Sequence, residues 1–383
     1  MVVSGAVATK HRQGGSIWVR MSWAEALRSA GFDVLFGELI EESACVGKDG
    51  RPSTFEDSAN LARFEQTMHD FGFGGCAALV CPSGPRVHGM EVDDLLARAA
   101  EAELLVNIGG HLRWGPLLRR LRRRAFIDLD PGFTQIWHAE GRPLGIDEHD
   151  LHFTVGMNVG TPRCPLPTNG IHWRAIRQPV TLERWPQPAG DELSSFTTVA
   201  SWRGAYGPAA WGGRTYGVKA HEFRRFLALA DQVEARFDLA LDIHPAEGAD
   251  LEQLGAYGWQ LLDPVAAAGD PAGFRRFVQA SGAEFSPAQG IYVHTCSGWF
   301  SDRTVRYLAS GRPALVQETG FGQHLPTGEG LIAFRTLEEA KAGARGMLED
   351  YPRHRRAARR IAEEHFSPQR AIEPLLEEAG VSP

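Results

Sequence analysis

Residues 2–36 read VVSGAVATKHRQGGSIWVRMSWAEALRSAGFDVLF and carry the clearest structural signal in the chain. The small apolar residues of Val2–Ala8 predict a buried strand, and the pair Gly14-Gly15 predicts a turn. Apolar residues then recur at helical spacing through Ser16–Ala30, and Phe32–Phe36 predicts a second strand. Strand, glycine turn, helix and strand in this order are typical of a βαβ unit, whose two strands lie parallel in one sheet.

The same alternation of strands and helices continues to the end of the chain. Further short apolar runs predict buried strands that are separated by segments with helical spacing. In order these runs are Gly75–Cys81, Leu104–Ile108, Ala125–Leu129, Phe196–Ala200, Leu239–Ile243, Trp259–Leu262, Gly290–His294, Ala314–Gln317 and Leu331–Phe334. Continuous apolar strands are expected in a parallel sheet that helices cover on both faces. The chain is therefore predicted to be an α/β protein with two Rossmann-like halves.

A proline-rich segment separates the two halves. Between Gly156 and Pro188 the prolines interrupt every helical period, which is typical of an extended connector. At 383 residues the chain is long enough for two domains of ordinary size. We expect an N-terminal domain at 1–157, the connector at 158–195, a second domain at 196–352 and C-terminal helices at 353–383.

The composition argues against several classes of protein. The 40 basic and 47 acidic side chains leave a net charge of −7, from which we expect no nucleic-acid partner. Five cysteines at irregular spacing form neither a disulfide framework nor a zinc pattern, so no metal site is expected. No apolar run is long enough to span a membrane and no targeting leader is evident. We therefore expect a soluble cytoplasmic protein without integral membrane contact.

Ligands of open α/β sheets bind beyond the carboxyl ends of the strands, near helix N-termini. Gly14 and Gly15 precede the first long helix, where a bare backbone lets a phosphate-bearing ligand approach closely; a simple tight turn explains them equally well. Arg203 follows the strand Phe196–Ala200, and Lys219 begins the next helix. Two cations there suit a diphosphate, and a solvated surface pair is the alternative. Because only four of the 40 basic residues are lysines, we favour a functional role for Lys219.

The segment 294–322, HTCSGWFSDRTVRYLASGRPALVQETGFG, holds the densest set of candidate ligand-binding residues. It runs from a predicted strand through a helix at Asp302–Ala309 into a second glycine-rich loop. Free amides at a helix N-terminus can bind an anion, and an acidic side chain beside exposed amides suits sugar hydroxyl groups. The candidates for these contacts and for a flat apolar wall are Trp299, Phe300, Ser301, Asp302, Glu318, Thr319, Gly320 and Phe321. For Asp302 a purely structural helix cap is the alternative.

The motif S-D-R-x4-L-A-S-G-R-P at 301–313, with E-T-G-F at 318–321, resembles the GT-B glycosyltransferases, especially their glycosyltransferase 4-like and CgeB-like groups. The resemblance implies two Rossmann-like domains that face each other across a cleft, the first binding the acceptor and the second a nucleotide-activated sugar. It also implies that the terminal helices return to the first domain. The nucleotide sugar would be a co-substrate, with no cofactor and no metal requirement. Gly298 and Arg306 stand where the family has its two glutamates, and Asp302 is the alternative ribose ligand.

Polar residues that follow strands of the first half are the candidates for acceptor contact. His111 follows Leu104–Ile108, and Asp130 follows Ala125–Leu129. Either can act as the base that deprotonates an acceptor hydroxyl in an inverting transfer, whereas a retaining transfer does not require one. For each residue alone, a structural role is the alternative.

The expected function is transfer of a sugar from a nucleotide donor to a small-molecule or glycan acceptor. A nucleotide-sugar epimerase on the same fold is one alternative, and it would act on the donor alone. A non-catalytic sugar-nucleotide or glycan-binding protein is the other, and it would give no product with any acceptor. The residues leave open the sugar, the nucleotide base, the stereochemistry and the oligomeric state.

Overall fold

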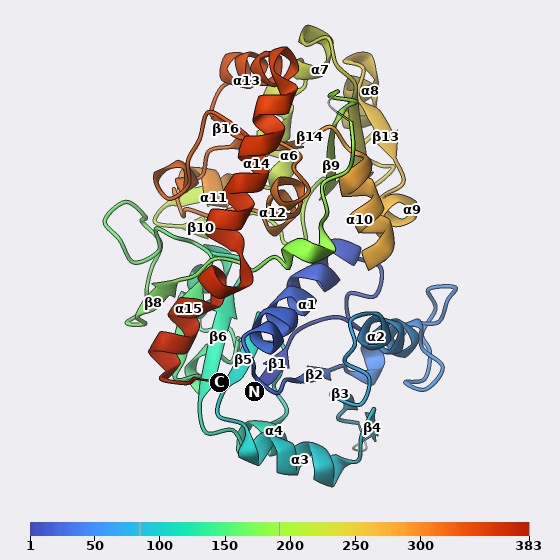
Figure 1. Ribbon diagram of the computed structural model, residues 1–383, viewed down its shortest axis with the longest axis vertical. Coiled ribbons are helices and arrows are strands. Elements are labelled where there is room, and N and C mark those ends of the chain that lie inside the picture. The colour runs from blue at the N-terminus through green and yellow to red at the C-terminus, as the bar shows by residue number, and fades with distance from the viewer. Residues whose placement is uncertain (84–85, 191, 383) are drawn as a thin grey trace.

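The computed structural model describes residues 1–83, 86–190 and 192–382, which form two α/β domains (Figure 1). Residues 84–85, 191 and 383, which fall in the predicted first domain, connector and C-terminal segment, lie outside the described residues. The first sheet has the strand order β4-β3-β2-β1-β5-β6-β7-β8. Its strands are β1 (Val2–Ser4), β2 (Leu35–Leu39), β3 (Ala77–Cys81), β4 (Arg86–His88), β5 (Leu105–Ile108), β6 (Arg124–Asp128), β7 (Leu151–Thr154) and β8 (Trp173–Ala175).

The second sheet has the order β13-β12-β9-β14-β15-β16. Its strands are β9 (Phe196–Ser201), β12 (Phe237–Asp242), β13 (Gln260–Leu262), β14 (Ala283–Ser286), β15 (Ala314–Gln317) and β16 (Leu331–Phe334), and they pair in parallel. Taken in chain order, both sheets contain the arrangement 3-2-1-4-5-6 that is typical of Rossmann folds. The first sheet adds β4, which is antiparallel to β3, and β8 at its edges. The predicted fold class, α/β with two Rossmann-like domains, is confirmed.

The strand predicted at Gly290–His294 is wrong. This segment is the short helix α11, and the strand that precedes it is β14, at Ala283–Ser286. All four residues of β14 are buried, including the charged Glu284. The Glu284 carboxylate interrupts the apolar run by which the other buried strands were predicted. The sequence GIYVH at 290–294 is more continuously apolar and therefore resembles a buried strand, although it forms a helix. Likewise, β8 lies inside the segment that we predicted as an extended connector.

Helices connect the strands in both domains. Those of the first domain are α1 (Gly14–Ser29), α2 (Ala59–Asp70), α3 (Val92–Glu101), α4 (Gly115–Leu118) and α5 (Phe133–Ala139). Those that follow are α6 (Lys219–Phe223), α7 (Leu229–Gln232), α8 (Gly248–Ala256), α9 (Pro264–Ala268), α10 (Pro271–Ala280), α11 (Gly290–His294), α12 (Asp302–Ala309), α13 (Leu337–Glu349), α14 (Tyr351–Phe366) and α15 (Pro368–Ala379).

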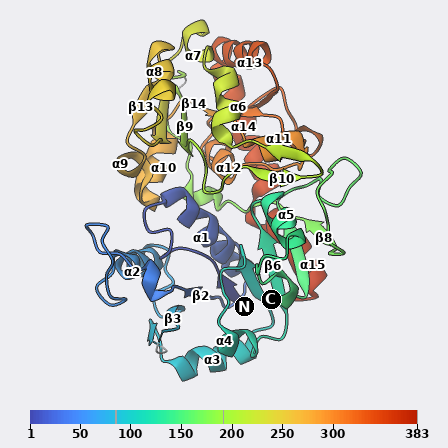
Figure 2. The same cartoon turned by 180° about the vertical axis from the view of Figure 1, so that it is seen from behind.

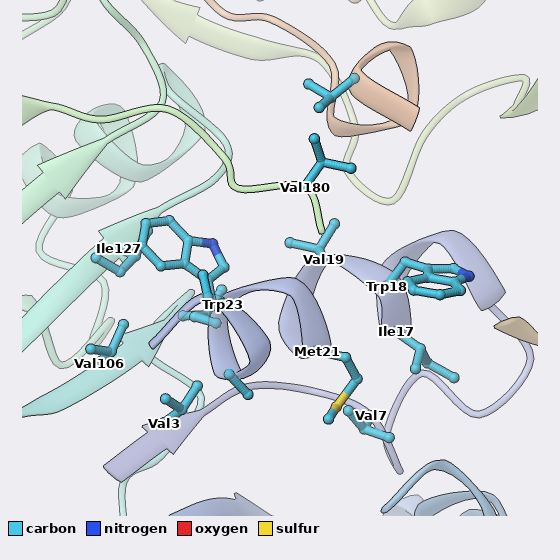
Figure 3. Packing of buried hydrophobic residues seen from close by; sticks show 14 of the residues in the cluster. Val3, Val7, Ile17, Trp18, Val19, Met21, Trp23, Val106, Ile127 and Val180 are labelled. Atoms are coloured by element: carbon cyan, nitrogen blue, oxygen red, sulfur yellow. The ribbon is translucent and has the colours of Figure 1, made fainter. Parts of the chain in front are cut away.

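The helix α1 is the central element of the larger hydrophobic core. Figure 3 shows its side chains among residues of the first sheet and the connector; the labelled ones are Val3, Val7, Ile17, Trp18, Val19, Met21, Trp23, Val106, Ile127 and Val180. Each fully buried side chain of this size contributes about 1.5–3 kcal/mol to stability. At its N-terminal end α1 packs on α10 of the second domain, and the Trp18 indole donates a hydrogen bond of 2.8 Å to the Pro271 carbonyl. One helix therefore holds both domains together.

The chain crosses between the domains twice, once in each direction. The connector is fastened to α1 by Arg184, whose Nη2 lies 2.6 Å from Glu25 Oε1. The C-terminal helices form the second crossing: α14 packs on α12 of the second domain, and α15 packs on α1 (Figure 1). The two crossings are hydrogen-bonded to each other, since the Val180 N–H donates to the Phe366 carbonyl at 2.9 Å.

A small hairpin of β10 (Ala209–Trp211) and β11 (Arg214–Tyr216) extends from the second domain to the first. It follows β9 and lies against α5, as Figure 2 shows from behind. Just before the hairpin, the Tyr206 ring packs edge-on against Trp137, with 4.6 Å between ring centroids. Among the described residues, no helix is both long and apolar enough to cross a membrane.

Candidate active site

Carboxyl-end loops of the two sheets meet where the domains face each other. Asp130 follows β6, and Tyr292 lies in α11, which follows β14. The Tyr292 hydroxyl donates a hydrogen bond of 3.0 Å to Asp130 Oδ1. Charged side chains from both domains act on one another around this bond. Together these residues form the interdomain site: Lys10, Arg20, His111, Asp130, Lys219, Tyr292, Asp302 and Arg303.

Asp130 is a half-buried carboxyl group with a raised pKa. Burial and the neighbouring carboxylate of Asp128 raise the pKa of Asp130 to about 6. The hydrogen bond from Tyr292 and the positive charges of Arg20 and Lys10 oppose this rise. Such a carboxyl group is ionised at neutral pH but basic enough to accept a proton from a reacting hydroxyl.

His111 is the weaker of the two predicted bases. Its side chain reaches solvent, but the surrounding protein atoms and the charges of Arg20 and Lys10 lower the pKa of His111 to about 3. The imidazole is therefore neutral at pH 7 and holds a proton poorly. It lies close enough to these cations to line the same site as Asp130.

Lys219 contributes a cation from the second domain. It begins α6 and is half-buried, and burial together with the charge of Arg303 lowers its pKa to about 7. Arg303 itself donates to the buried Glu284 at 2.5 Å. Among the described residues, no hydrogen bond or ion pair involves the Lys219 ammonium group. Its protons are therefore free to bind a phosphate oxygen.

The predicted pairing of Arg203 with Lys219 is wrong. Arg203 is exposed and forms an ion pair with Glu247 in the loop after β12. Lys219 instead interacts with Arg303, which lies in α12. The strand order explains the difference: β12 and β14 lie on opposite sides of β9, and Arg203 turns toward β12.

Of the two residues predicted to form a flat apolar wall, Trp299 and Phe300, only Trp299 has a partly exposed side chain. Trp299 is partly exposed, and its ring stacks on Tyr292 at 4.3 Å between centroids. Phe300 is buried between Phe321 and Phe366, with centroid distances of 5.1 and 5.5 Å. The prediction of Phe300 and Phe321 as ligand contacts is therefore wrong, because both side chains belong to the core.

Two small polar candidates are also buried. The Thr319 hydroxyl is used within the protein, because it donates to the Trp299 carbonyl at 2.5 Å. Ser301 is 2% exposed and precedes α12. The side chain of Thr319 thus supports the loop backbone. The contact predicted for Ser301 is through its backbone amide at the start of α12, and it stays a prediction.

Gly14 and Gly15 make room for protein packing. A Cβ on Gly14 would lie 2.1 Å from the Asp270 carbonyl oxygen, and one on Gly15 would lie 2.9 Å from the Phe274 ring. These residues belong to the second domain at the start of α10. The glycines therefore permit close contact between α1 and α10, which differs from the ligand loop that we predicted.

Glu318 organises the loop after β15. Its Oε1 accepts hydrogen bonds from the backbone N–H groups of Gly320, at 2.6 Å, and Gly322, at 3.3 Å. The loop borders a cavity of about 600 Å³ that is also lined by His294, Gln317 and Arg335. Glu318 and Gly320 thus lie where a bound molecule can reach them.

Arg306, which stands at a glutamate position of the resembling family, links the two domains. It is fully buried and donates to the Asp302 carbonyl at 2.8 Å and to Ser22 Oγ of α1 at 3.1 Å. Burial lowers the pKa of Arg306 to about 10. The Asp302 carboxylate remains half-buried, and its charge acts on both Lys219 and Arg20.

Four residues of the interdomain site were not predicted: Lys10, Arg20, Tyr292 and Arg303. Lys219 became a candidate because lysine is rare in this chain, and the same argument would have selected Lys10. Nothing local in the sequence marks Tyr292, because its partner Asp130 lies 162 positions away. Among the described residues, no group of three or more His, Cys, Asp or Glu side chains could hold a metal ion.

Comparison with solved structures identifies the fold. Anabaena Alr3699/HepE in complex with UDP-glucose is similar with a TM-score of 0.58 and 13% identity, covering 99% of this chain and 98% of that one. An alpha-glucosyltransferase in complex with UDP and a 13-mer DNA has a TM-score of 0.56 and 11% identity, covering 99% of both chains. Sucrose-phosphate synthase from Thermosynechococcus elongatus has a TM-score of 0.52 and 11% identity, covering 99% and 96%. No family model and no curated protein sequence matches the chain.

These similarities confirm the expected GT-B fold, and they contradict one prediction about partners. We expected no nucleic acid on the ground of net charge. Two of the similar structures, both alpha-glucosyltransferases, contain DNA. A net charge of −7 is therefore no reason to exclude nucleic acid for a protein of this fold, and the prediction is withdrawn.

Proposed function

We propose that the protein transfers a sugar from a nucleotide-activated donor to an acceptor hydroxyl at the interdomain site. The observation that carries the proposal is the meeting of Asp130 from one domain with Lys219 from the other through a single charged network. Asp302 connects the two halves of this network, because its charge acts on Lys219 and on Arg20, which in turn acts on Asp130. A base and a phosphate-binding cation are the two groups that an inverting transfer needs.

The donor would lie against the second domain. As the bond between the sugar C1 and the diphosphate oxygen breaks, its electron pair passes to the diphosphate, and charge develops there. The Lys219 ammonium group, with Arg303 behind it, would stabilise that charge. Glu318 and Gly320 border the cavity at the loop after β15, and we place the remainder of the donor against them.

The acceptor would lie against the first domain. Its hydroxyl oxygen forms the new bond to C1, and its proton passes to the Asp130 carboxylate. Attack from the side opposite the leaving diphosphate inverts the configuration at C1. The proposal also includes that the transferred sugar is a hexose and that no metal is required. It further includes that the chain is related to the glycosyltransferase 4-like and CgeB-like groups. In this proposal domain 1–157 binds the acceptor and domain 196–352 binds the donor.

The similar structures guide the choice of acceptors to be tested. The similar structures include enzymes whose names specify a sugar phosphate product or whose crystals contain DNA. Nucleic acid therefore belongs in the acceptor panel together with glycans and small molecules. Transfer in the presence of EDTA would support metal independence.

The direct test measures UDP and UDP-sugar binding by calorimetry, followed by product formation with the acceptor panel. Lys219→Gln should weaken UDP binding by about 10- to 100-fold, as expected for loss of a charged hydrogen bond of about 1.5–3 kcal/mol. Lys48→Gln is the matched control, because it removes the same charge at an exposed position. Equal UDP affinity in both variants would contradict the donor assignment. Conversion of the donor without any acceptor would instead indicate an epimerase.

A further inference from the structure

We propose that the cavity of about 600 Å³ beside the loop after β15 binds an uncharged sugar ring, and that His294 contacts this ring and helps to select it. This inference rests on the proposed function, and it names the kind of group that the cavity receives. The ring belongs either to the transferred sugar of the donor or to a sugar unit of the acceptor. In both cases the diphosphate and the nucleobase lie outside the cavity.

The buried carboxylate of Glu222 holds three side chains that line the cavity. Glu222 lies in α6, and its two oxygens accept hydrogen bonds from residues of three other elements. The donors are His294 Nε2 of α11 at 2.8 Å, Gln317 Nε2 of β15 at 2.6 Å and Arg225 Nη1, in the short turn after α6, at 2.5 Å. All three donor residues border the cavity. Because one carboxylate orients them together, their positions are set before a ligand binds.

The imidazole of His294 keeps one nitrogen for a ligand. A carboxylate only accepts hydrogen bonds, so Nε2 carries the hydrogen that Glu222 accepts, and Nδ1 of the neutral ring is an acceptor. The side chain is 50% exposed, and Nδ1 forms no hydrogen bond within the described part of the chain. A sugar hydroxyl group both donates and accepts, so it can donate to this nitrogen.

The composition of the walls favours an uncharged ligand. Each arginine at the cavity is paired with a carboxylate: Arg225 with Glu222, and Arg335 Nη2 with Glu318 Oε2 at 3.6 Å. The described residues that line the cavity therefore offer no surplus positive charge to a diphosphate. They also include no Phe, Tyr or Trp ring on which a nucleobase could stack. Hydroxyl groups of a sugar can accept from the guanidinium groups and donate to the imidazole and the Glu318 carboxylate.

The cavity adjoins both the diphosphate cation and the first domain. Glu222 follows Lys219 by three positions in α6, so the two side chains lie on one face of that helix, roughly 5–6 Å apart between Cβ atoms. At the opposite wall, Asn158, in the loop between β7 and β8, donates from Nδ2 to the carbonyl of Cys296 at 2.8 Å. A Cβ on Gly320 would overlap with Asn158 Nδ2, so this glycine lets the two domains meet at the cavity wall.

The thiol of Cys296 reports on occupancy of the cavity. It is exposed at the cavity wall, whereas Cys45, Cys81 and Cys164 are buried and Cys76, just before β3 in the first domain, is half-buried. The experiment measures how fast N-ethylmaleimide alkylates Cys296 in the wild-type protein, by mass spectrometry of its peptides, with Cys76 as the internal control. The probes are UDP, a panel of UDP- and GDP-linked hexoses, methyl hexosides added to the UDP-bound protein, and inorganic phosphate.

A sugar probe should slow the alkylation of Cys296 and leave that of Cys76 unchanged. Slowing by a nucleotide sugar well beyond that by UDP places the donor sugar in the cavity, and slowing by a methyl hexoside places an acceptor sugar there. His294→Gln keeps an N–H donor for Glu222 and removes Nδ1, so the affinity of the protecting sugar should fall by about 2- to 10-fold, as for one neutral hydrogen bond. His69→Gln, at an exposed position of α2, is the matched control and should behave as the wild type.

Three outcomes would overturn the inference. If UDP or inorganic phosphate protected Cys296 as strongly as the best sugar, the cavity would hold the nucleotide or an anion. If no sugar protected Cys296 in protein that binds UDP, the cavity would not be a sugar site. If His294→Gln and His69→Gln gave equal protection, His294 would not contact the ring. Failure of the proposed function looks different, because wild-type protein would then bind no nucleotide and form no product. Thermal unfolding of both variants verifies that folded proteins are compared.

Discussion

Tyr292 and Asp130, which belong to different domains, are joined by a hydrogen bond of 3.0 Å in which the phenol is the donor. The ring of Tyr292 is 2% exposed and is held on its face by Trp299. The bond therefore forms only when the two domains are in contact, and it stabilises the ionised form of the carboxyl group. The contact between the domains and the ionisation of Asp130 are therefore coupled by one hydrogen bond.

Replacing Tyr292 with Phe should move the acidic limb of the kcat/KM profile to higher pH. The wild-type limb is expected near pH 6, because Asp130 must be ionised to act as a base. Without the phenol, the carboxylate loses a hydrogen bond to its charged form, so its pKa rises further. The measurement is kcat/KM between pH 5 and 9. An unchanged limb would mean that Asp130 is not the titrating group.

Asp130→Asn should abolish most of the catalysis while sparing donor binding. General bases contribute about 10²- to 10⁴-fold to rates, so kcat should fall by that factor. UDP affinity, measured by calorimetry, should change little, because the donor contacts lie in the second domain. A matched His111→Gln variant should be far milder, since His111 is a poor base. A larger loss in the histidine variant would reverse this assignment.

UDP affinity should fall as pH rises through about 7. Lys219 has a pKa of about 7 and binds the diphosphate only when it is protonated, so the loss occurs on the alkaline side. Lys219→Arg should remove this pH dependence, because a guanidinium group stays protonated throughout the range. Calorimetric titrations at pH 6, 7, 8 and 9 compare the two proteins. If UDP affinity depended on pH in the same way in both proteins, a group other than Lys219 would control the pH dependence of binding.

Glu38→Ala should destabilise the first domain. The substitution removes the acceptor of three backbone N–H groups, two of them buried, in the loop after β1: those of Val7, Ala8 and Thr9. With about 1–3 kcal/mol lost for each donor left unpaired, we expect the free energy of unfolding to fall by about 3 kcal/mol. Urea denaturation measures it, and Glu41→Ala at an exposed position serves as the control. Equal stability of the two variants would show that water replaces the carboxylate.

Much of the fold could be predicted because its strands are short apolar runs between turns. The bounds of β15, β16 and α12 coincide with the predicted ones. The strand β14 was missed because Glu284 lies in its middle, and the reason for that charge is tertiary: it pairs with Arg303 of α12. Local pattern cannot reveal a carboxylate whose partner lies on another element.

The site was less predictable than the fold. Asp130 and Lys219 could be named as candidates because they follow or precede predictable elements at the carboxyl ends of strands. Arg20 looks like an ordinary residue of an amphipathic helix, and only the burial of residues 17–27 on all sides of α1 shows that it lies inside the protein. Phe300 was assigned to a wall because sequence gives hydrophobicity but not direction, and its side chain turns into the core.

The hydrogen bond between Val180 and Phe366 has a mechanical consequence. Both covalent crossings pass through this point, so the connector and the C-terminal helices would move together if the two domains separated. Such a separation would also break the hydrogen bonds from Trp18 to Pro271 and from Arg306 to Ser22, which join α1 to α10 and α12.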